Sequence, residues 1–483
     1  MNKANPLRNL FSIVFGRTSE LILTFFSITI LVRYLGATNY GIFASSVAFL
    51  SIISKTVDFG FSQIIFREFS ANSKYKSVIN AALNIRLISI VVLAVLYNIF
   101  AYLISMQSEE IVITNILFAN IIFSAKLRNI RDLIEIPFKS ILKMDIVMFA
   151  TFIDSLFLLL FIISATLLNF NLIEITICYT VSNLPGFLIL IYYSRSFEQF
   201  KYKFELNNLK WLFKESFPLW GAGILSIIFL QADVFLLKVF SSPTDAGYYS
   251  AALRIGVPLS IFPLSIITTI FPIIIKYRKT DLEQSNFIAN FSYKILLLLL
   301  FIPSVIVTFK SSDIISLLYG SEFEPASLSL IILYWSFLFY YLGILSQNLI
   351  TIVNKQKHNF FYSLILVTIL LPMLYFTLQV YGPNGTAASR LVASFVGFIY
   401  VAFILIKSGF AITFMNIKLL TSLVVIFLSA LIIYKLDIFL FIPVLITIII
   451  FQIYILKFFN KKELELFYKI LKEPKWLKPL LKT

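Results

Sequence analysis

Apolar stretches of about 20 residues recur along almost the whole chain and are separated by short polar segments. Stretches of this length are typical of helices that cross a membrane, whereas a transmembrane β-strand is shorter and alternates apolar with polar residues. The pattern therefore predicts an all-α integral membrane protein. We expect fourteen spans, at 10–32, 42–65, 78–103, 111–125, 145–168, 172–193, 217–237, 247–275, 287–309, 326–350, 359–381, 385–406, 415–434 and 437–456.

The composition supports this prediction, because 59% of the 483 residues are hydrophobic and only 13% are charged. The single cysteine, Cys178, excludes a disulfide framework, and the single histidine, His358, leaves little scope for histidine catalysis. No polar stretch is long enough for a separate soluble catalytic domain. These features favour a transporter over an enzyme, and we expect neither a metal site nor a cofactor.

The net charge of +16 is distributed unevenly among the expected loops. With the N-terminus inside, the outer loops hold few basic residues, whereas the loops at 65–77, 126–144, 194–216 and 276–286 are rich in lysine and arginine. Positive residues favour the cytoplasmic side of a membrane. The bias predicts that both termini are cytoplasmic, and it explains the positive charge without a nucleic-acid partner.

Two expected outer loops share a pattern of a basic residue, a turn, and a glycine followed by aromatic and small residues. They lie at 31–45 and 237–251, with the glycines at Gly41 and Gly247. The second loop comes six spans after the first, an even number that gives both halves the same orientation, so the pattern predicts two halves related by a pseudo-two-fold axis along the membrane normal. We expect a six-helix bundle at 1–193, a cytoplasmic linker at 194–216, a second bundle at 217–406, two additional helices at 407–456 and a basic amphipathic cytoplasmic tail at 457–483.

Charged residues interrupt several of the apolar stretches. A central charge costs about 2.5–3.5 kcal/mol on insertion scales, so eight facing lipid would cost on the order of 20 kcal/mol. That exceeds the roughly 5–15 kcal/mol by which a typical fold is stable. These groups must therefore pair with one another or line a polar cavity inside the bundle. They are Arg17, Glu20, Lys55, Asp58, Asp154, Asp233, Arg254 and Arg390.

Each of the first two spans contains one possible ion pair. Arg17 and Glu20 lie three residues apart, as do Lys55 and Asp58, and this spacing allows each pair to bond along its helix. Each pair has two possible roles, which the spacing leaves open: it fixes helix packing, or it lines a binding cavity.

The remaining basic residues divide into two groups. Arg254 and Arg390 have no acid three or four positions away, which favours a binding role. Arg86 and Lys294 lie about two turns from the cytoplasmic ends of their spans, where snorkelling accounts for them. A cavity containing Arg17, Lys55, Arg254 and Arg390 suits a diphosphate or an acidic sugar, because arginine donates two parallel hydrogen bonds to phosphate oxygens.

The segment Arg33-Tyr-Leu-Gly-Ala-Thr-Asn-Tyr-Gly, followed by Asp58-Phe-Gly-Phe and Arg67-Glu68, resembles the start of the Wzx-type flippases for O-antigen and capsule repeat units. Ala246-Gly-Tyr-Tyr-Ser-Ala-Ala-Leu-Arg254 is similar to the matching motif of their second half. These flippases belong to the multidrug/oligosaccharidyl-lipid/polysaccharide (MOP) exporter superfamily. The resemblance covers nearly the whole chain in topology, and its sequence motifs are short.

The resemblance implies two six-helix bundles around a central cavity that opens to alternate sides of the bacterial inner membrane. The implied substrate is an undecaprenyl-diphosphate-linked oligosaccharide, bound by the four basic residues above and carried to the outer leaflet. The polysaccharide polymerase and the chain-length regulator would be partners. Coupling to protons or sodium is common in the superfamily, and the candidates here are Glu20, Asp58, Asp154 and Asp233.

Three other functions remain open. A lipid II flippase of the same superfamily would share the basic cavity, whereas a multidrug exporter would favour an acidic one. A membrane polymerase or ligase would need a large outer loop for its site. The longest expected outer loop, 310–325, carries one lysine and is too small for that purpose.

Overall fold

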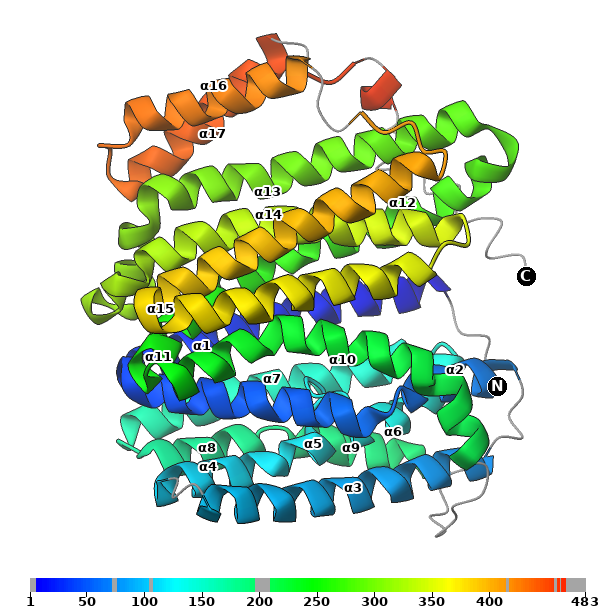
Figure 1. Ribbon diagram of the computed structural model, residues 1–483, viewed down its shortest axis with the longest axis vertical. Coiled ribbons are helices and arrows are strands. Elements are labelled where there is room, and N and C mark those ends of the chain that lie inside the picture. Colours follow the sequence, from blue (N-terminus) through cyan, green and yellow to red (C-terminus); the bar gives the residue numbers. More distant parts are fainter. Residues whose placement is uncertain are drawn as a thin grey trace. The chain divides into compact units, whose positions relative to one another are not determined.

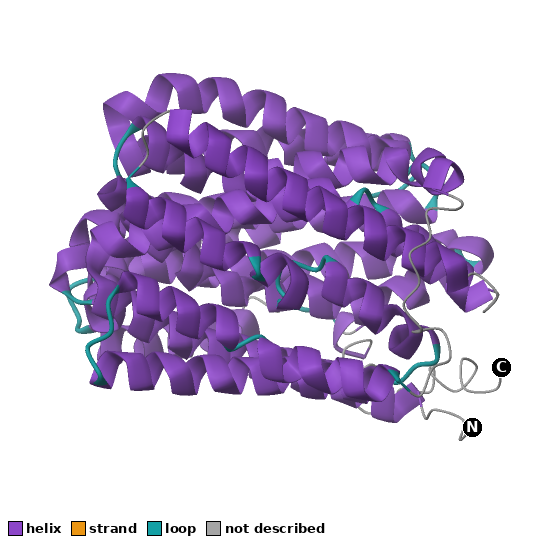
Figure 2. Ribbon diagram, turned by 90° about the horizontal axis from the view of Figure 1, so that it is seen from below, coloured by secondary structure: helices purple, strands orange, loops and turns teal. Residues whose placement is uncertain are grey.

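The computed structural model describes residues 6–71, 76–103, 107–195, 209–413, 417–455, 458–460 and 462–465. Within these ranges the regular structure consists of helices, without strands (Figure 2). Among the described residues, ten helical stretches are long and apolar enough to cross a membrane. The prediction of an all-α, multi-pass membrane protein is therefore confirmed. The segment 196–208 of the expected linker and most of the expected amphipathic tail lie outside the described residues.

The chain divides into two compact units, Met1–Ser250 and Ala251–Thr483. Long helices in the first unit run alongside one another (Figure 1). Its helices are α1 (Pro6–Asp58), α2 (Phe61–Ala71), α3 (Lys76–Leu103), α4 (Ser108–Phe118), α5 (Asn120–Phe123), α6 (Ile130–Ser140), α7 (Met144–Leu167), α8 (Leu172–Val181), α9 (Leu184–Ser194), α10 (Leu209–Phe240) and the beginning of α11 (Pro243–Gly256).

The helix α1 contains two antiparallel spans, which meet at Gly36. The backbone of Gly36 has φ 68° and ψ 176°, a conformation that is accessible mainly to glycine. In a straight helix Glu20 and Ser54 would be about 50 Å apart. Instead, Glu20 lines a pocket with Lys126, and the Ser54 hydroxyl donates to the carbonyl of Leu127 at 2.9 Å. The turn lies between the first two expected spans.

The second half of α1 ends at Asp58, seven residues before the expected end of the second span. Phe59 and Gly60 both have positive φ, of 51° and 71°, and this left-handed turn stops the helix. A Cβ at Gly60 would lie 3.0 Å from the Ser216 carbonyl oxygen of α10. The glycine therefore allows the turn to pack closely on the α10 backbone. The short helix α2 follows and packs on α6.

The second unit contains the end of α11, η2 (Val257–Ser260), α12 (Ile261–Thr280), α13 (Leu282–Tyr319), η3 (Ser321–Ala326), α14 (Ser327–Ile352), α15 (Lys357–Lys407), α16 (Ile417–Ile433) and α17 (Ile438–Ile455). Like α1, α15 holds two spans, which meet at Gly382 with φ 49° and ψ −128°. A Cβ at Gly397 would lie 2.7 Å from the Leu366 side chain, although a straight helix would separate the two residues by about 46 Å.

The last two helices, α16 and α17, pack on α13 through a core that includes Leu298, Val305 and Phe441. The connection from α15 is held to the unit by Arg278, whose guanidinium lies 4.1 Å from the Phe410 ring centroid and donates to the Gly409 carbonyl at 2.9 Å. These contacts make α16 and α17 part of the second unit rather than loose appendages.

Lys294 of α13 makes an ion pair with Glu463 at 3.0 Å and also donates to the Phe458 carbonyl. Lys294, for which snorkelling was expected, therefore lies beside an acidic partner from the end of the chain. This carboxylate stabilises the charge of the lysine.

All fourteen expected spans fall mainly on helix within the described residues. Helix α1 holds most of the expected spans 10–32 and 42–65, and α15 holds 359–381 and 385–406. The fourth span, 111–125, is interrupted between α4 and α5, and the sixth, 172–193, between α8 and α9. These interruptions bring polar backbone into the interior of the first unit.

Candidate functional site

The two expected intrahelical pairs are present. The Arg17 guanidinium donates to the Glu20 carboxylate at 2.8 Å, and the Lys55 ammonium donates to the Asp58 carboxylate at 2.6 Å. The side chain of Arg17 is 36% exposed, and that of Lys55 is 33% exposed. Both cations are therefore accessible at one end while their acids are buried.

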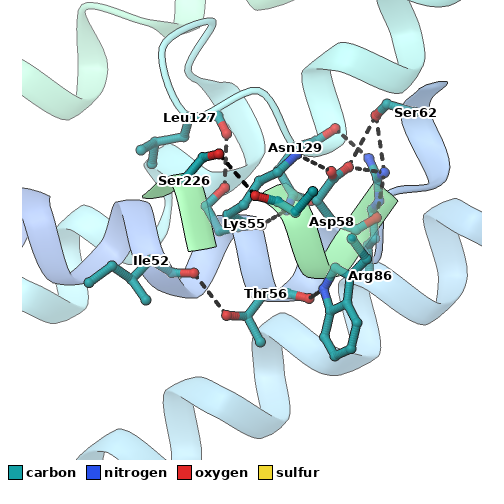
Figure 3. A network of polar contacts seen from close by, with 12 residues as sticks. Ile52, Lys55, Thr56, Asp58, Ser62, Arg86, Leu127, Asn129 and Ser226 are labelled. Carbon is teal, nitrogen blue, oxygen red and sulfur yellow. Dashed lines mark hydrogen bonds and ion pairs between the residues drawn. The ribbon is translucent and has the colours of Figure 1, made fainter. Parts of the chain in front are cut away.

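Asp58 has a second cationic partner, Arg86 of α3, which spacing within one helix does not reveal (Figure 3). The Arg86 side chain is 0% exposed and also donates to the backbone carbonyls of Asp58, at 2.9 Å, and Asn129, at 2.8 Å. The expectation of snorkelling for Arg86 is therefore wrong. Its charge is stabilised by the Asp58 carboxylate and by two backbone carbonyls. These carbonyls lie at the end of α1 and just before α6, where they have no helical hydrogen-bond partner.

Lys55, Asp58 and Arg86 together form a buried triad with two cations and one acid. The end of the triad that solvent reaches is the Lys55 ammonium, since Asp58 and Arg86 are almost fully buried. Gly223 of α10 makes room for it, because a Cβ there would lie 2.6 Å from Lys55 Cε. The accessible part of the triad is therefore a cation, while Asp132 of α6 adds a further negative charge close enough to interact electrostatically with Arg86.

A second buried arginine, Arg131 of α6, organises the other side of the unit. Its guanidinium pairs with Asp154 of α7, donates to Glu135 at 3.1 Å and donates to the Phe123 carbonyl at 3.2 Å. Asp154 also accepts from the Gly186 backbone N–H of α9 at 2.7 Å. The predicted candidate Asp154 thus joins α6, α7 and α9, through a partner that the sequence placed in a cytoplasmic loop.

The remaining predicted residues are divided between the two units. Asp233 of α10 is 0% exposed and accepts from the Tyr249 hydroxyl at 2.6 Å. In the second unit, Arg254 is half-buried on α11. Arg390 of α15 is 4% exposed and lies close enough to Tyr340 and Tyr341 of α14 to interact electrostatically with both.

The two interrupted spans of the first unit meet at a pair of asparagines. Asn183, at the break between α8 and α9, donates to the Asn120 side chain at 3.0 Å, and Asn120 donates to the Thr180 hydroxyl at 2.9 Å. Irregular backbone occurs at membrane depth only where protein buries it or where it lines a polar cavity. A small pocket does lie here, and it is lined by Glu20, Ala125, Lys126, Thr151, Asp154, Ser155, Leu158, Ser182 and Asn183.

The glycines of the repeated loops, Gly41 and Gly247, pack against each other's loop. A Cβ at Gly41 would overlap the carbonyl oxygen of Pro243, and a Cβ at Gly247 would overlap that of Ala37. Thr38 and Thr244 are hydrogen-bonded side by side at 2.8 Å. The repeated glycine is therefore required by the close approach of two backbones, which the sequence pattern alone did not indicate.

The fold is shared with solved membrane proteins of low sequence identity. It is similar to the lipid II flippase MurJ in an inward closed conformation, with a TM-score of 0.76 and 18% identity over 96% of this chain and 99% of that chain. It is also similar to a point mutant of the MATE transporter VcmN of Vibrio cholerae, with a TM-score of 0.58 and 15% identity over 83% and 95% of the two chains.

A multidrug resistance MATE transporter of the MOP superfamily, in an inward-facing conformation, has a TM-score of 0.56 and 14% identity over 79% of this chain and 99% of that one. These neighbours are named as a flippase and as transporters, in agreement with the expectation of a transporter rather than an enzyme. No curated protein is matched by the sequence.

At the level of sequence, residues 7–278 match the model of a family described as polysaccharide biosynthesis protein. The match begins in α1 and continues into the last turn of α12, so it includes the buried triad, both interrupted spans and the repeated loops. Because it covers more than half of the sequence, this chain belongs to the polysaccharide biosynthesis protein family.

Proposed function

We propose that the protein is a flippase that carries undecaprenyl-diphosphate-linked oligosaccharides, of the O-antigen or capsule repeat-unit type, from the cytoplasmic to the outer leaflet. The observation that carries this proposal is the Lys55 ammonium, whose side chain is 33% exposed while its partners Asp58 and Arg86 are almost fully buried inside the first unit. Such a charge attracts an anion. In polysaccharide biosynthesis a lipid-linked sugar diphosphate is an anion that has to cross the membrane.

In this mechanism Arg17, Lys55, Arg254 and Arg390 contact the diphosphate and the sugars. Arginine supplies paired donors to phosphate oxygens and Lys55 a mobile point charge. The tyrosines beside Arg390 add hydroxyl groups and ring faces that suit sugars. The prenyl tail stays in the lipid while access to the head group alternates between the two sides.

Coupling to protons or sodium belongs to the same proposal, with Glu20, Asp58, Asp154 and Asp233 as the candidate groups. Asp58 and Asp154 each hold a fully buried arginine. Protonation of either acid would remove one counter-charge from a buried guanidinium, which is unfavourable enough to change the packing of the first unit. Movement of one proton is in this way linked to a change of conformation.

The proposal places the protein in the bacterial inner membrane with both termini in the cytoplasm. Its partners are then the lipid-linked substrate, membrane lipids, the polysaccharide polymerase and the chain-length regulator. The support for this orientation is the excess of basic residues in the loops expected to be cytoplasmic.

The test is complementation of a deletion strain with Arg254→Ala and Arg390→Ala variants. We expect expression to be retained, surface polysaccharide to be lost, and lipid-linked repeat units to accumulate on the cytoplasmic side. Lys279→Ala, which removes an exposed lysine near the end of α12, serves as the control and keeps polymer at the level of the unmodified protein. Normal polymer in both arginine variants would contradict the proposed anion site.

A second candidate, a lipid II flippase, is favoured by one observation. Nearly the full lengths of this chain and of MurJ align, with the TM-score of 0.76. That function predicts that depletion stops growth and traps peptidoglycan precursors, whereas a repeat-unit flippase predicts loss of polymer from cells that still grow. If the protein were a multidrug exporter, its deletion would cause neither of these results and would instead make the cells more sensitive to drugs.

A further inference from the structure

The pocket at the two interrupted spans has an unusual hydrogen-bonding character. The hydroxyls of Thr151, Ser155 and Ser182 donate to backbone carbonyls of their own helices, at 2.9, 3.1 and 2.7 Å. Asn183 uses its amide group as a donor twice, to Asn120 and to the Tyr179 carbonyl. These neutral side chains therefore have only lone pairs left for the pocket.

The charged lining adds further acceptors. Glu20 has one carboxylate oxygen bonded to Arg17, and its other oxygen has no hydrogen-bond donor among the residues that the structure describes. Asp154 contributes a second carboxylate, already held by Arg131 and the Gly186 N–H. A pocket built from acceptors binds a cation or an ammonium group, and not an anion. Its interior has room for roughly one water-sized group.

Lys126 is the one basic residue among those that line the pocket. Lys126 lies in the irregular segment between α5 and α6, where neighbouring Leu127 is anchored to Ser54. Its side chain is exposed, and among the described residues no carboxylate lies within 4 Å of its ammonium, which is 5.7 Å from the Tyr179 ring centroid. The backbone at Lys126 is thus held in place while the charged end is able to move.

We propose that this pocket is a monovalent-cation site whose resident cation is the Lys126 ammonium itself. The ammonium moves between the Glu20 and Asp154 carboxylates and the solvent-exposed position over Tyr179. A sodium or small ammonium ion enters the pocket only when the lysine is removed or drawn out. This step rests on the proposed function. The same movement lets Lys126 contact the diphosphate of the substrate, so binding of the diphosphate outside the pocket draws the ammonium out of it.

The unused acceptors, rather than the charge balance, explain why a cation fits the pocket. Arg17 pairs with one oxygen of Glu20, and Arg131 pairs with one oxygen of Asp154. The acceptors that remain available are the hydroxyl oxygens of Thr151, Ser155 and Ser182. A tethered ammonium supplies donors there without the entropic cost of capturing a free ion, because the chain already holds it at high effective concentration.

The test is thermal unfolding of the full-length protein in detergent, with methylammonium chloride as the probe and choline chloride, whose cation is too large, as the ionic-strength control. In Lys126→Ala we expect a saturable rise in Tm of roughly 2 °C with methylammonium. The wild type, whose pocket already has a cation, and Lys143→Ala, which removes an exposed lysine after α6, show no such rise.

Two further variants complete the design. Lys126→Met removes the charge but keeps most of the stem, and it gives the same probe-dependent rise if Lys126→Ala does not purify. Glu20→Gln combined with Lys126→Ala reduces the rise, because it removes a carboxylate from the pocket. The proposal is overturned if neither lysine variant responds, if the wild type responds equally, or if the double variant responds as strongly as Lys126→Ala.

This binding measurement does not depend on flipping. Loss of surface polysaccharide in Lys126→Ala, together with the rise in Tm, supports both the pocket and the exchange with the substrate. If Lys126→Ala shows the rise in Tm but normal surface polysaccharide, the cation site is supported and the proposed exchange with the substrate is overturned.

Discussion

At the scale of the residue, the buried arginines Arg86 and Arg131 decide how the acids of the first unit behave. Each is 0% exposed and pairs with an aspartate on another element. A buried ion pair contributes little net stability, but removing one partner leaves an uncompensated charge. Asp58 and Asp154 therefore have structural partners as well as the coupling role proposed for them.

Replacing Arg86 with alanine should destabilise the protein by about 3–5 kcal/mol, because the Asp58 carboxylate and two backbone carbonyls lose their donor. The measurement is the Tm in detergent together with the amount of protein recovered. Arg128→Ala is the control, since Arg128 is an exposed arginine in the neighbouring segment and should leave the Tm unchanged. Equal Tm values for the two variants would show that Arg86 contributes no such stabilisation.

The pair Asp132–Lys139 of α6 makes a prediction about pH. Burial by itself would raise the pKa of Asp132, but the Lys139 ammonium at 2.6 Å, together with Ser62 and Arg86, outweighs burial and holds that pKa below its ordinary value. A carboxyl group whose pKa is lower in the folded than in the unfolded protein stabilises the fold at pH values above its unfolded pKa. This contribution is lost as the pH falls below about 4. Lys139→Met should therefore weaken the decrease in Tm between neutral and acidic pH. An unchanged pH profile would contradict the assignment.

At the scale of the element, close contacts between helices depend on single glycines. Gly247 lies where α11 meets the α1 turn, and its Cβ position is occupied by the Ala37 carbonyl oxygen. Gly223 lies where α10 meets α1, and its Cβ position faces only the flexible end of the Lys55 side chain. The two glycines therefore give different predictions for the same substitution.

Gly247→Ala should destabilise the protein by about 1–3 kcal/mol or more, because a backbone has to move to admit the methyl group. The Tm and the yield of folded protein measure this effect. Unchanged stability would mean that the α1 turn and α11 separate without cost.

Gly223→Ala should leave the Tm nearly unchanged but reduce surface polysaccharide, because it displaces the Lys55 ammonium from the triad. Lys55→Ala is the reference variant for the loss of that charge. Full polysaccharide in Gly223→Ala, with a loss in Lys55→Ala, would show that the position of the ammonium is not critical.

At the scale of the whole molecule, the uneven distribution of basic residues predicts the orientation in the membrane. In a Cys178→Ala background, a cysteine at Lys143 should react with a membrane-impermeant thiol reagent only after the membrane is opened. A cysteine at Asp313 should react in intact spheroplasts. The reverse pattern would mean that both termini lie outside.

Much of the fold could be predicted from the sequence because the signals are local. Hydrophobic stretches of membrane thickness indicate the spans, and a spacing of three residues indicates the pairs Arg17–Glu20 and Lys55–Asp58. The interruption of α4–α5 and α8–α9 was missed, because their apolar composition continues across the breaks. Asn120 marks the first break as an isolated asparagine, which is a weak signal, whereas Asn183 is followed by Pro185 and Gly186, a turn signal within an otherwise apolar stretch.

The sequence by itself determined that this is an all-helical membrane protein with charged residues inside it, since both properties follow from local hydrophobicity and its cost in lipid. The tertiary structure alone decided which charges meet. Arg86 and Asp58 are 28 residues apart, and Arg131 and Asp154 are 23 apart on different helices. The packing of α1, α3, α6 and α7 brings them together, because a buried charge has a low free energy only beside a counter-charge, wherever in the chain that partner lies.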